Sequence, residues 1–187
     1  MKFEYVNHTD VISAWDCEDI IKQYSQKLSV AVTADEAGQH RRKSNIVFIE
    51  DRELKTHIAN FAAFVNRRAF GFNLDLAYFD LQFTEYLAEE QGHYDWHIDI
   101  TPDRLKQNPG QDSVYDRKLS VTLLLSHPDD YEGGNLELIT SLPTDAEKYR
   151  QQGSAVVFPS FIGHRVTPVT KGKRYSLVAW LEGPKFQ

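Results

Sequence analysis

Two stretches in the first third of the chain carry apolar residues at helical spacing. The first has Ser13 or Asp16 as its candidate N-cap and holds Trp15, Ile20, Ile21, Tyr24 and Leu28. The second follows Asp51, also a candidate N-cap, and holds Leu54, Ile58, Phe61, Ala62 and Val65. Between them, Thr33–Ser44 is polar and basic and predicts an exposed loop, and the apolar run within Asn45–Glu50 predicts a short strand.

From Asn73 onwards the apolar period changes from helical to 2, which is typical of strands with one buried face. Gly133 and Gly134 can take the positive φ of a turn between two of these strands. The predicted strands cover 73–86, 119–126, 135–140, 155–158 and 174–181. Many short strands after two helices predict a mainly β, α+β fold: a double-stranded β-helix (jelly roll, cupin-like) buttressed by N-terminal helices. We expect a single domain over 1–187, with helical support in roughly 1–70 and the jelly-roll core in roughly 72–183.

Composition narrows the class of protein. The 187 residues are 41% hydrophobic and 26% charged, as in ordinary globular proteins, and the net charge of −6 disfavours nucleic acid as a partner. The lone cysteine, Cys17, fits a reducing compartment. No apolar run is long enough to cross a membrane and the N-terminus does not resemble a secretory signal, so we expect a soluble, cytoplasmic protein without a membrane partner.

The segment HYDWHID holds the candidate metal ligands His97 and Asp99. On a strand, residues i and i+2 point to the same face, so the two side chains would project together. His164 follows a predicted strand and a turn and is the candidate third ligand. Two histidines and one carboxylate leave three positions of an iron ion open, an arrangement typical of non-haem iron(II) oxygenases. His-x-Asp alone is more often a surface pair, and we assign ordinary surface or hydrogen-bonding roles to His8, His40, His57 and His127, leaving His93 open.

Arg174 is the candidate anchor for an anionic co-substrate. Lys171–Lys173 reads as a turn, which would make the flanking segments a hairpin and return Arg174 to the side of the His164 strand. A guanidinium matches a carboxylate bidentately, so an arginine there can hold the distal carboxylate of a dicarboxylic acid. Taken alone, Arg174 would more simply be a surface arginine beside two lysines.

Taken together, WHID, RKLSVTLLLSHPDDYEGGNLELI and AVVFPSFIGHRVTPVTKGKRYSLVAW resemble the 2-oxoglutarate and iron(II) dioxygenase superfamily, especially its prolyl 4-hydroxylase-like branch of bacterial and phage prolyl/lysyl hydroxylase-domain proteins. The resemblance covers roughly Phe72–Gly183. It implies that His97, Asp99 and His164 bind the metal and that Arg174 anchors 2-oxoglutarate. It also implies that Tyr86 hydrogen-bonds 2-oxoglutarate and that Trp180 closes the pocket, although either residue could be plain core.

The chain departs from the family pattern at several points. Leu123–Leu125 stand where some relatives place a tyrosine that contacts the co-substrate. Trp180 stands where the nucleic-acid demethylase branch has a second arginine, which disfavours a nucleobase substrate. The chain stops seven residues after Trp180, short of the C-terminal extension of many relatives.

The resemblance implies Fe(II), 2-oxoglutarate and O2 as cofactor and co-substrates, with ascorbate as a further requirement of some members. The implied reaction hydroxylates an unactivated C–H bond and releases succinate and CO2. Peptidyl proline is the favoured substrate, and a free amino acid or other small molecule is the alternative. A non-catalytic metal-binding jelly roll is a third hypothesis, disfavoured by the intact ligand set.

Pro102–Asp116, polar and placed directly after the HxD segment, is the predicted lid.

Overall fold

One hydrogen-bonded sheet dominates the part of the chain that the computed structural model describes, residues 3–34, 40–100, 115–141 and 149–185. Its strand order is β1-β9-β6-β11-β4-β3-β5-β10-β8, with β2 added to β3 and β7 added to β11. The strands are β1 Val6–His8, β2 Ser29–Ala34, β3 His40–Phe48, β4 Asp75–Leu87, β5 His93–His97, β6 Tyr115–Leu124, β7 Tyr131–Gly133, β8 Leu136–Leu138, β9 Ala155–Pro159, β10 His164–Val166 and β11 Val169–Pro184.

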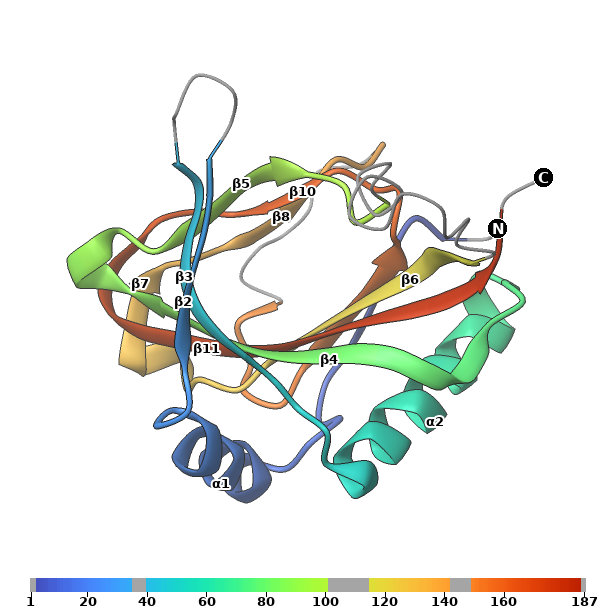
Figure 1. Cartoon of the computed structure of the whole chain (residues 1–187), viewed down its shortest axis with the longest axis horizontal. Helices are drawn as coiled ribbons and strands as arrows, with labels where there is room; N and C mark the ends of the chain where they lie inside the picture. Colours follow the sequence, from blue (N-terminus) through green and yellow to red (C-terminus); the bar gives the residue numbers. More distant parts are fainter. Residues whose placement is uncertain (1–2, 35–39, 101–114, 142–148, 186–187) are drawn as a thin grey trace.

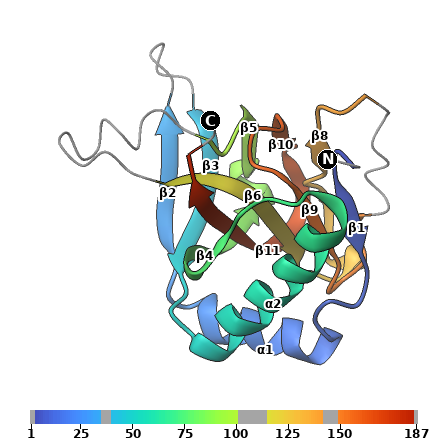
Figure 2. The ribbon, with the colours of Figure 1, turned by 90° about the vertical axis from the view of Figure 1, so that its right-hand side faces the viewer.

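The sheet folds over on itself into two layers (Figure 1). The long strands β4, β6 and β11 form the lower layer in this view, and β5, β10 and β8 form the upper one. Helices α1 (Ala14–Tyr24) and α2 (Arg52–Ala69) both lie below the lower layer, on the side away from the upper layer (Figures 1 and 2). The predicted jelly roll with helical support is therefore confirmed. Two short 3-10 helices, Ala88–Glu90 and Pro128–Asp130, complete the regular structure.

Both helices begin at capping residues that the sequence indicates. The Ser13 hydroxyl accepts from the Asp16 backbone N–H at 3.1 Å, and the Asp51 carboxylate accepts from that of Leu54 at 2.9 Å. Ser13 is thus the N-cap of α1. The Asp16 carboxylate accepts a hydrogen bond from the Ser13 hydroxyl at 2.6 Å. These side chains satisfy N–H groups that have no partner inside the helix. Neither described helix is long and apolar enough to span a membrane.

Two apolar cores hold the layers together. The first joins the helices to the lower layer and includes Ile20, Ile58, Val65, Phe83 and Leu177. The second lies between the two layers and includes Tyr86, Leu136, Phe158 and Val166. Full burial of a side chain of this size contributes about 1.5–3 kcal/mol, so the helices fix the lower layer firmly. The second core surrounds the space into which the candidate ligands project.

The predicted loop Thr33–Ser44 is wrong at both of its ends. Residues up to Ala34 belong to β2 and those from His40 belong to β3, and the two strands pair antiparallel with Thr33 opposite Arg42. Residues 35–39 lie outside the described part. Within the described residues β2 pairs only with β3, so it is an edge strand, and edge strands commonly carry charged residues. Polarity was therefore a poor indicator of a loop here.

The predicted turn at Lys171–Lys173 is also wrong. β11 runs through these residues without reversing and is hydrogen-bonded to β4, β6 and β7, not to β10. Gly172 pairs with Tyr131 of β7 and has a φ of +69°, and a side chain there would collide with the Asp130 carbonyl. The glycine therefore allows close strand packing. In contrast, the turn at Gly133 and Gly134 is confirmed, with φ of +71° and +61° between β7 and β8.

Candidate metal centre

His97 and His164 come together because β5 and β10 are antiparallel neighbours. His97 is the last residue of β5, His164 is the first of β10, and the two are directly paired in the register. Their ring centroids are 4.1 Å apart. Asp99 lies just beyond the end of β5, where its backbone N–H donates to the Ser160 carbonyl at 2.9 Å. The expectation that Asp99 shares a strand with His97 is wrong, but the turn after β5 brings the carboxylate to the same place.

The three side chains form a compact group of donor atoms. One ligand atom from each lies within 4.8 Å of the others. The Nε2 of His97 is 3.7 Å from one Asp99 carboxylate oxygen, and the Nε2 of His164 is 3.5 Å from the other. Asp99 is 5% exposed and His164 is 6% exposed. A carboxylate buried this deeply needs a positive partner, and a divalent metal supplies one.

Backbone carbonyls fix the tautomer of both histidines. The Nδ1 of His97 lies 2.7 Å from the Asp95 carbonyl, and the Nδ1 of His164 lies 3.0 Å from the Ile162 carbonyl. A carbonyl can only accept, so each Nδ1 carries the proton and each Nε2 presents its lone pair toward Asp99. Burial, and then repulsion from His164, lowers the pKa of His97. Both effects favour the neutral imidazole that binds metal.

Two serines that the sequence does not single out orient the Asp99 carboxylate. The Ser120 hydroxyl donates to Asp99 at 2.6 Å and lies 2.9 Å from the Ser160 hydroxyl. All three residues are buried. Outer hydrogen bonds of this kind hold a ligating carboxylate in position. The signal in the sequence for Ser120 is that Ser120 and Thr122 alternate with apolar residues in the run LSVTLLL.

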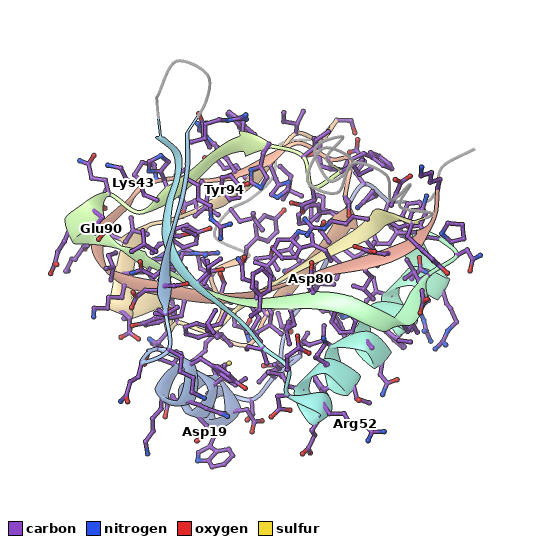
Figure 3. The ribbon with its side chains drawn as sticks, in the orientation of Figure 1. Asp19, Lys43, Arg52, Asp80, Glu90 and Tyr94 are labelled. Atoms are coloured by element: carbon purple, nitrogen blue, oxygen red, sulfur yellow. The ribbon has the colours of Figure 1, made fainter. Side chains whose placement is uncertain are left out.

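Tyr94 and Arg42 form one wall of the site. The Tyr94 ring, which Figure 3 labels on β5, stacks on His97 with centroids 3.5 Å apart. The Arg42 guanidinium lies 4.8 Å from the centre of the Tyr94 ring. Arg42 lines the same cavity and was missed because it fell in the supposed loop. The stack fixes the plane of the His97 imidazole.

The remaining described histidines make local contacts away from the cluster. His8 packs edge-on to Phe61, and ring nitrogens of His57 and His93 approach the carbonyls of Val11 and Gln91 at 2.9 and 2.8 Å. His127 accepts from the Asp129 backbone at 3.3 Å. None of these four belongs to the group of metal-ligating atoms found among the described residues.

Arg174 projects into the cavity that the three candidate ligands line. It lies on β11 directly opposite Tyr86 of β4, and its guanidinium carbon is 5.6 Å from the centre of the Tyr86 ring. The side chain is 3% exposed, and one Nη donates to Ser176 at 3.2 Å. Its Nε is buried without a hydrogen-bond partner among the described residues. A buried guanidinium with an unused donor fits a carboxylate ligand, so this observation agrees with an acidic co-substrate.

Trp180 faces the same cavity because residues six apart on a strand share a face. The Arg117 guanidinium lies 4.2 Å from its ring centre and fixes the ring from the other side. The Trp180 indole N–H is also buried without a partner in the described residues. All six predicted site residues, His97, Asp99, His164, Arg174, Tyr86 and Trp180, therefore line one cavity. A larger cavity lies between the helices, and it contains none of these six residues.

The donor set fits iron. Two imidazole nitrogens and one carboxylate oxygen lie within 4.8 Å of one another, and the three residues line the same cavity as Arg174. This is the ligand set of non-haem iron(II) oxygenases. In agreement with the geometry, residues 81–182 match the 2OG-Fe(II) oxygenase superfamily.

The chain belongs to this superfamily. It is 30% identical over 184 residues to a PKHD-type hydroxylase of Prochlorococcus marinus, covering 96% of this chain and 78% of the relative. With PKHD-type hydroxylases of Hyphomonas neptunium, Alteromonas mediterranea and Teredinibacter turnerae, the similar region spans only 28%, 39% and 38% of the relative's length.

Solved structures of two prolyl hydroxylases share the fold. A Pseudomonas putida prolyl-4-hydroxylase superimposes with a TM-score of 0.69 at 18% identity, over 97% of this chain and 94% of that one. A Trichoplax adhaerens prolyl hydroxylase, in complex with a hypoxia inducible factor peptide fragment, superimposes with a TM-score of 0.66 at 15% identity. The superposition covers 95% of this chain and 83% of that one. The predicted lid Pro102–Asp116 cannot be compared, because residues 101–114 lie outside the described part and Tyr115 and Asp116 begin β6.

Proposed function

We propose that this oxygenase hydroxylates a peptidyl proline, using Fe(II) held by His97, Asp99 and His164 and 2-oxoglutarate held by Arg174. The observation that carries the proposal is the buried, unpartnered Nε of Arg174 in the cavity of the metal-ligand cluster. A metal-binding module without catalysis has no need of a buried cation beside its metal. The proposal thus joins a metal site and an anion site in one cavity.

Each side chain has a distinct task in this scheme. Bound iron and 2-oxoglutarate supply the oxidation, in which O2 is consumed, 2-oxoglutarate becomes succinate and CO2, and a C–H bond becomes C–OH. Arg174 neutralises and orients the distal carboxylate, since its planar fork can donate two parallel hydrogen bonds. We propose that the Tyr86 hydroxyl donates to the same ligand, because Tyr86 lies opposite Arg174 on the neighbouring strand and lines the same cavity. Trp180, which is buried, and Tyr94, which is partly buried, exclude water from the cavity with their rings.

Two exposed apolar residues adjacent in sequence to the site support an apolar substrate group, although neither lines the cavity that contains the ligands. Ile98, between His97 and Asp99, is 45% exposed, and Phe161, next to Ser160, is 40% exposed. Exposed apolar side chains beside a reactive centre are typical of binding surfaces. A proline ring suits them better than a charged free amino acid. The named activities of the relatives, PKHD-type and prolyl hydroxylases, support the same substrate class.

Turnover with a peptide panel tests the proposal. Succinate is measured with Fe(II), 2-oxoglutarate and O2, with and without proline-containing peptides, and each peptide is examined by mass spectrometry for a gain of one oxygen. Proline-to-alanine versions of the same peptides serve as controls. We propose ascorbate as an auxiliary reductant. Leaving ascorbate out of the succinate assay tests this proposal. Oxygen gain on a free amino acid alone, with all peptides unchanged, would replace the proline proposal by the small-molecule alternative.

A further inference from the structure

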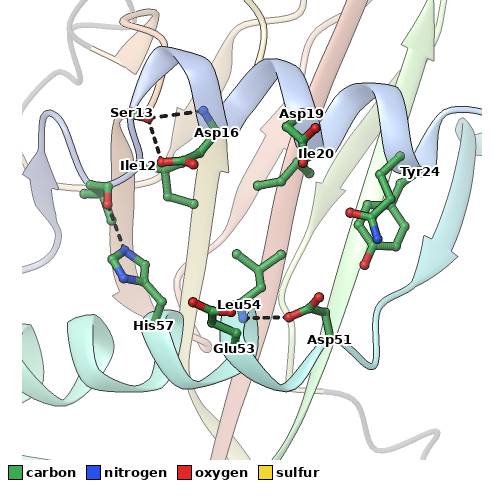
Figure 4. A pocket seen from close by; sticks show the side chains of 12 residues that line it. Ile12, Ser13, Asp16, Asp19, Ile20, Tyr24, Asp51, Glu53, Leu54 and His57 are labelled. Atoms are coloured by element: carbon green, nitrogen blue, oxygen red, sulfur yellow. Dashed lines mark hydrogen bonds between the residues drawn. The ribbon is translucent and has the colours of Figure 1, made fainter.

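Two cavities in the described part of the chain differ in charge. Among the described residues that line the metal cavity, Arg42 and Arg174 are cationic and Asp99 is the one carboxylate. The cleft between α1 and α2 has the opposite character, because four carboxylates and no lysine or arginine line it in the described part of the chain (Figure 4). Charge is therefore segregated in this acidic chain, and the field in the metal cavity favours anions.

The proposed reaction accounts for the charges in the metal cavity except that of Arg42. Fe(II) is a dication, and its histidine ligands bind as neutral imidazoles. The charge of Asp99 compensates part of the metal charge. The remainder, together with the charge of Arg174, balances 2-oxoglutarate, which is a dianion. Arg42 lines the same cavity and is left with an uncompensated positive charge.

Arg42 is held at the cavity wall with most of its hydrogen-bond donors unused. It is half-buried and lies on β3 opposite Tyr94 of β5. Its Nε donates to the Ser44 hydroxyl at 2.8 Å, and its guanidinium carbon lies 4.8 Å from the centre of the Tyr94 ring. No hydrogen bond or ion pair joins its two Nη groups to another described residue. The N–H donors of a fixed, planar fork are thus available to a ligand that enters the cavity.

The guanidinium of Arg42 is within reach of a residue next to the one being hydroxylated. The Tyr94 ring that it contacts is stacked on the metal ligand His97, with ring centres 3.5 Å apart. Consecutive Cα atoms are about 3.8 Å apart, so a residue one or two positions from the target can bring its side chain to Arg42. β3 also carries Arg41 and Lys43 and no acidic residue, which strengthens the positive field at this wall.

We propose that Arg42 determines substrate specificity by binding the carboxylate of an aspartate or glutamate beside the target proline. This inference rests on the proposed peptidyl-proline function and adds a substrate class to it, acidic peptides. A guanidinium binds a carboxylate through two parallel, charge-assisted hydrogen bonds, which a neutral amide side chain cannot form. An arginine that only fixed the Tyr94 ring would give no preference between the two kinds of peptide.

Peptide binding tests the role of Arg42 independently of turnover. Fluorescence anisotropy is measured on the chain loaded with Fe(II) and 2-oxoglutarate under anaerobic conditions, where no peptide is consumed. The labelled peptides form matched pairs with glutamate or glutamine directly before or after one proline. Both peptide ends are blocked, so that the side chain supplies the sole carboxylate. In at least one of the two positions, the wild type should bind the glutamate peptide at least about tenfold more tightly than its glutamine partner.

Two variants separate recognition of a carboxylate from support of the Tyr94 ring. Arg42→Gln should bind the glutamate and glutamine peptides equally, at about the affinity of the wild type for the glutamine peptide. Arg42→Glu should invert the preference and favour lysine peptides over glutamate peptides. The matched control Arg41→Gln removes the same charge from the neighbouring residue, which is exposed and does not line the cavity. Its preference for glutamate should stay within twofold of that of the wild type.

Several outcomes would overturn the proposal. Absence of peptide binding to the wild type is one, and equal affinities for its glutamate and glutamine peptides are another. An equal loss of preference in Arg41→Gln and Arg42→Gln would show a diffuse positive field. A uniform loss of affinity for all peptides in Arg42→Gln would mean that Arg42 only supports Tyr94.

The hydroxylation assay distinguishes failure of this inference from failure of the proposed function. Equally efficient oxygen gain on glutamate and glutamine peptides would leave proline hydroxylation standing and reject the assignment of Arg42. A preference for glutamate in binding, with no oxygen gain at any proline, would support the assignment of Arg42 and reject proline hydroxylation.

Discussion

His97 and His164 stand directly opposite each other across the β5–β10 pair, with ring centroids 4.1 Å apart. The register of two short strands therefore sets the distance between the candidate metal ligands. Each ring is oriented by a backbone carbonyl two residues before it in the chain, Asp95 for one and Ile162 for the other. The cluster is prearranged by backbone structure and needs no large movement to accept a metal.

Loss of any one ligand should abolish turnover. We expect His97→Ala, Asp99→Ala and His164→Ala each to reduce iron-dependent succinate formation by at least 100-fold, because two remaining protein ligands hold the metal poorly. Circular dichroism and the melting temperature should show a folded chain in each case. Undiminished turnover in one variant would remove that residue from the ligand set.

Replacing Arg174 by lysine should raise the Michaelis constant for 2-oxoglutarate. An ammonium cannot reproduce the bidentate fork, and hydrogen bonds to charged groups contribute about 1.5–3 kcal/mol, so we expect a rise of roughly 10- to 100-fold. The turnover number at saturating 2-oxoglutarate should change much less. An unchanged Michaelis constant would mean that the acid is anchored elsewhere.

Ser120→Ala tests the positioning of Asp99. The variant loses the 2.6 Å hydrogen bond to the carboxylate, and loss of such outer contacts typically weakens metal affinity by roughly 10- to 100-fold. Ser160→Ala, which removes only the partner of Ser120, should have a smaller effect. Equilibrium dialysis with Fe(II) under anaerobic conditions measures both. Equal Fe(II) affinities in the wild type and the two variants would mean that Ser120 only packs against its neighbours and does not position Asp99.

Tyr175 should make stability depend on alkaline pH. Its hydroxyl donates to buried Glu85 at 2.9 Å, and burial, followed by Glu85, raises the pKa of Tyr175 above its ordinary value of about 10. Above that pH the unfolded chain releases the tyrosine proton while the folded chain keeps it. The contribution of the protonated Tyr175 hydroxyl to the free energy of unfolding is therefore complete below about pH 10. It declines as the pH rises toward the folded-state pKa of Tyr175.

Urea unfolding between pH 8 and 11 checks this prediction. The wild type should lose up to about 1.4 kcal/mol more per pH unit above pH 10 than Tyr175→Phe, which has no proton to release at this site. Parallel stability curves for the two proteins would contradict the expected linkage.

Much of this arrangement follows from local sequence patterns. Alternation predicts the long strands, side-chain oxygens predict the caps at Ser13 and Asp51, and the HxD segment with a distant histidine predicts the cluster. The misses depend on long-range pairing. Nothing local to Gly172 distinguishes a turn from an irregular strand, because β7 determines which one forms.

Polar residues were the other source of error. Arg42 lies in a strand because β2 and β5 pair with β3 on either side of it, opposite Thr33 and Tyr94, which its charged neighbours do not reveal. From the sequence alone, Ser120 is a hydroxyl within an apolar run. Its role follows only from the turn after β5, which brings Asp99 within hydrogen-bonding distance. Such contacts join residues far apart in the chain, so periodicity alone does not predict them.

An anaerobic titration of the protein with Fe(II) and 2-oxoglutarate tests the central claim most directly, since it needs no knowledge of the substrate. A keto acid that chelates ferrous iron gives a visible charge-transfer absorption. We expect this absorption to saturate at one iron per chain, to vanish in Asp99→Ala, and to require higher 2-oxoglutarate concentrations in Arg174→Lys. If the wild type gives no such absorption, or if Asp99→Ala gives it undiminished, the three residues do not form the iron site of this oxygenase.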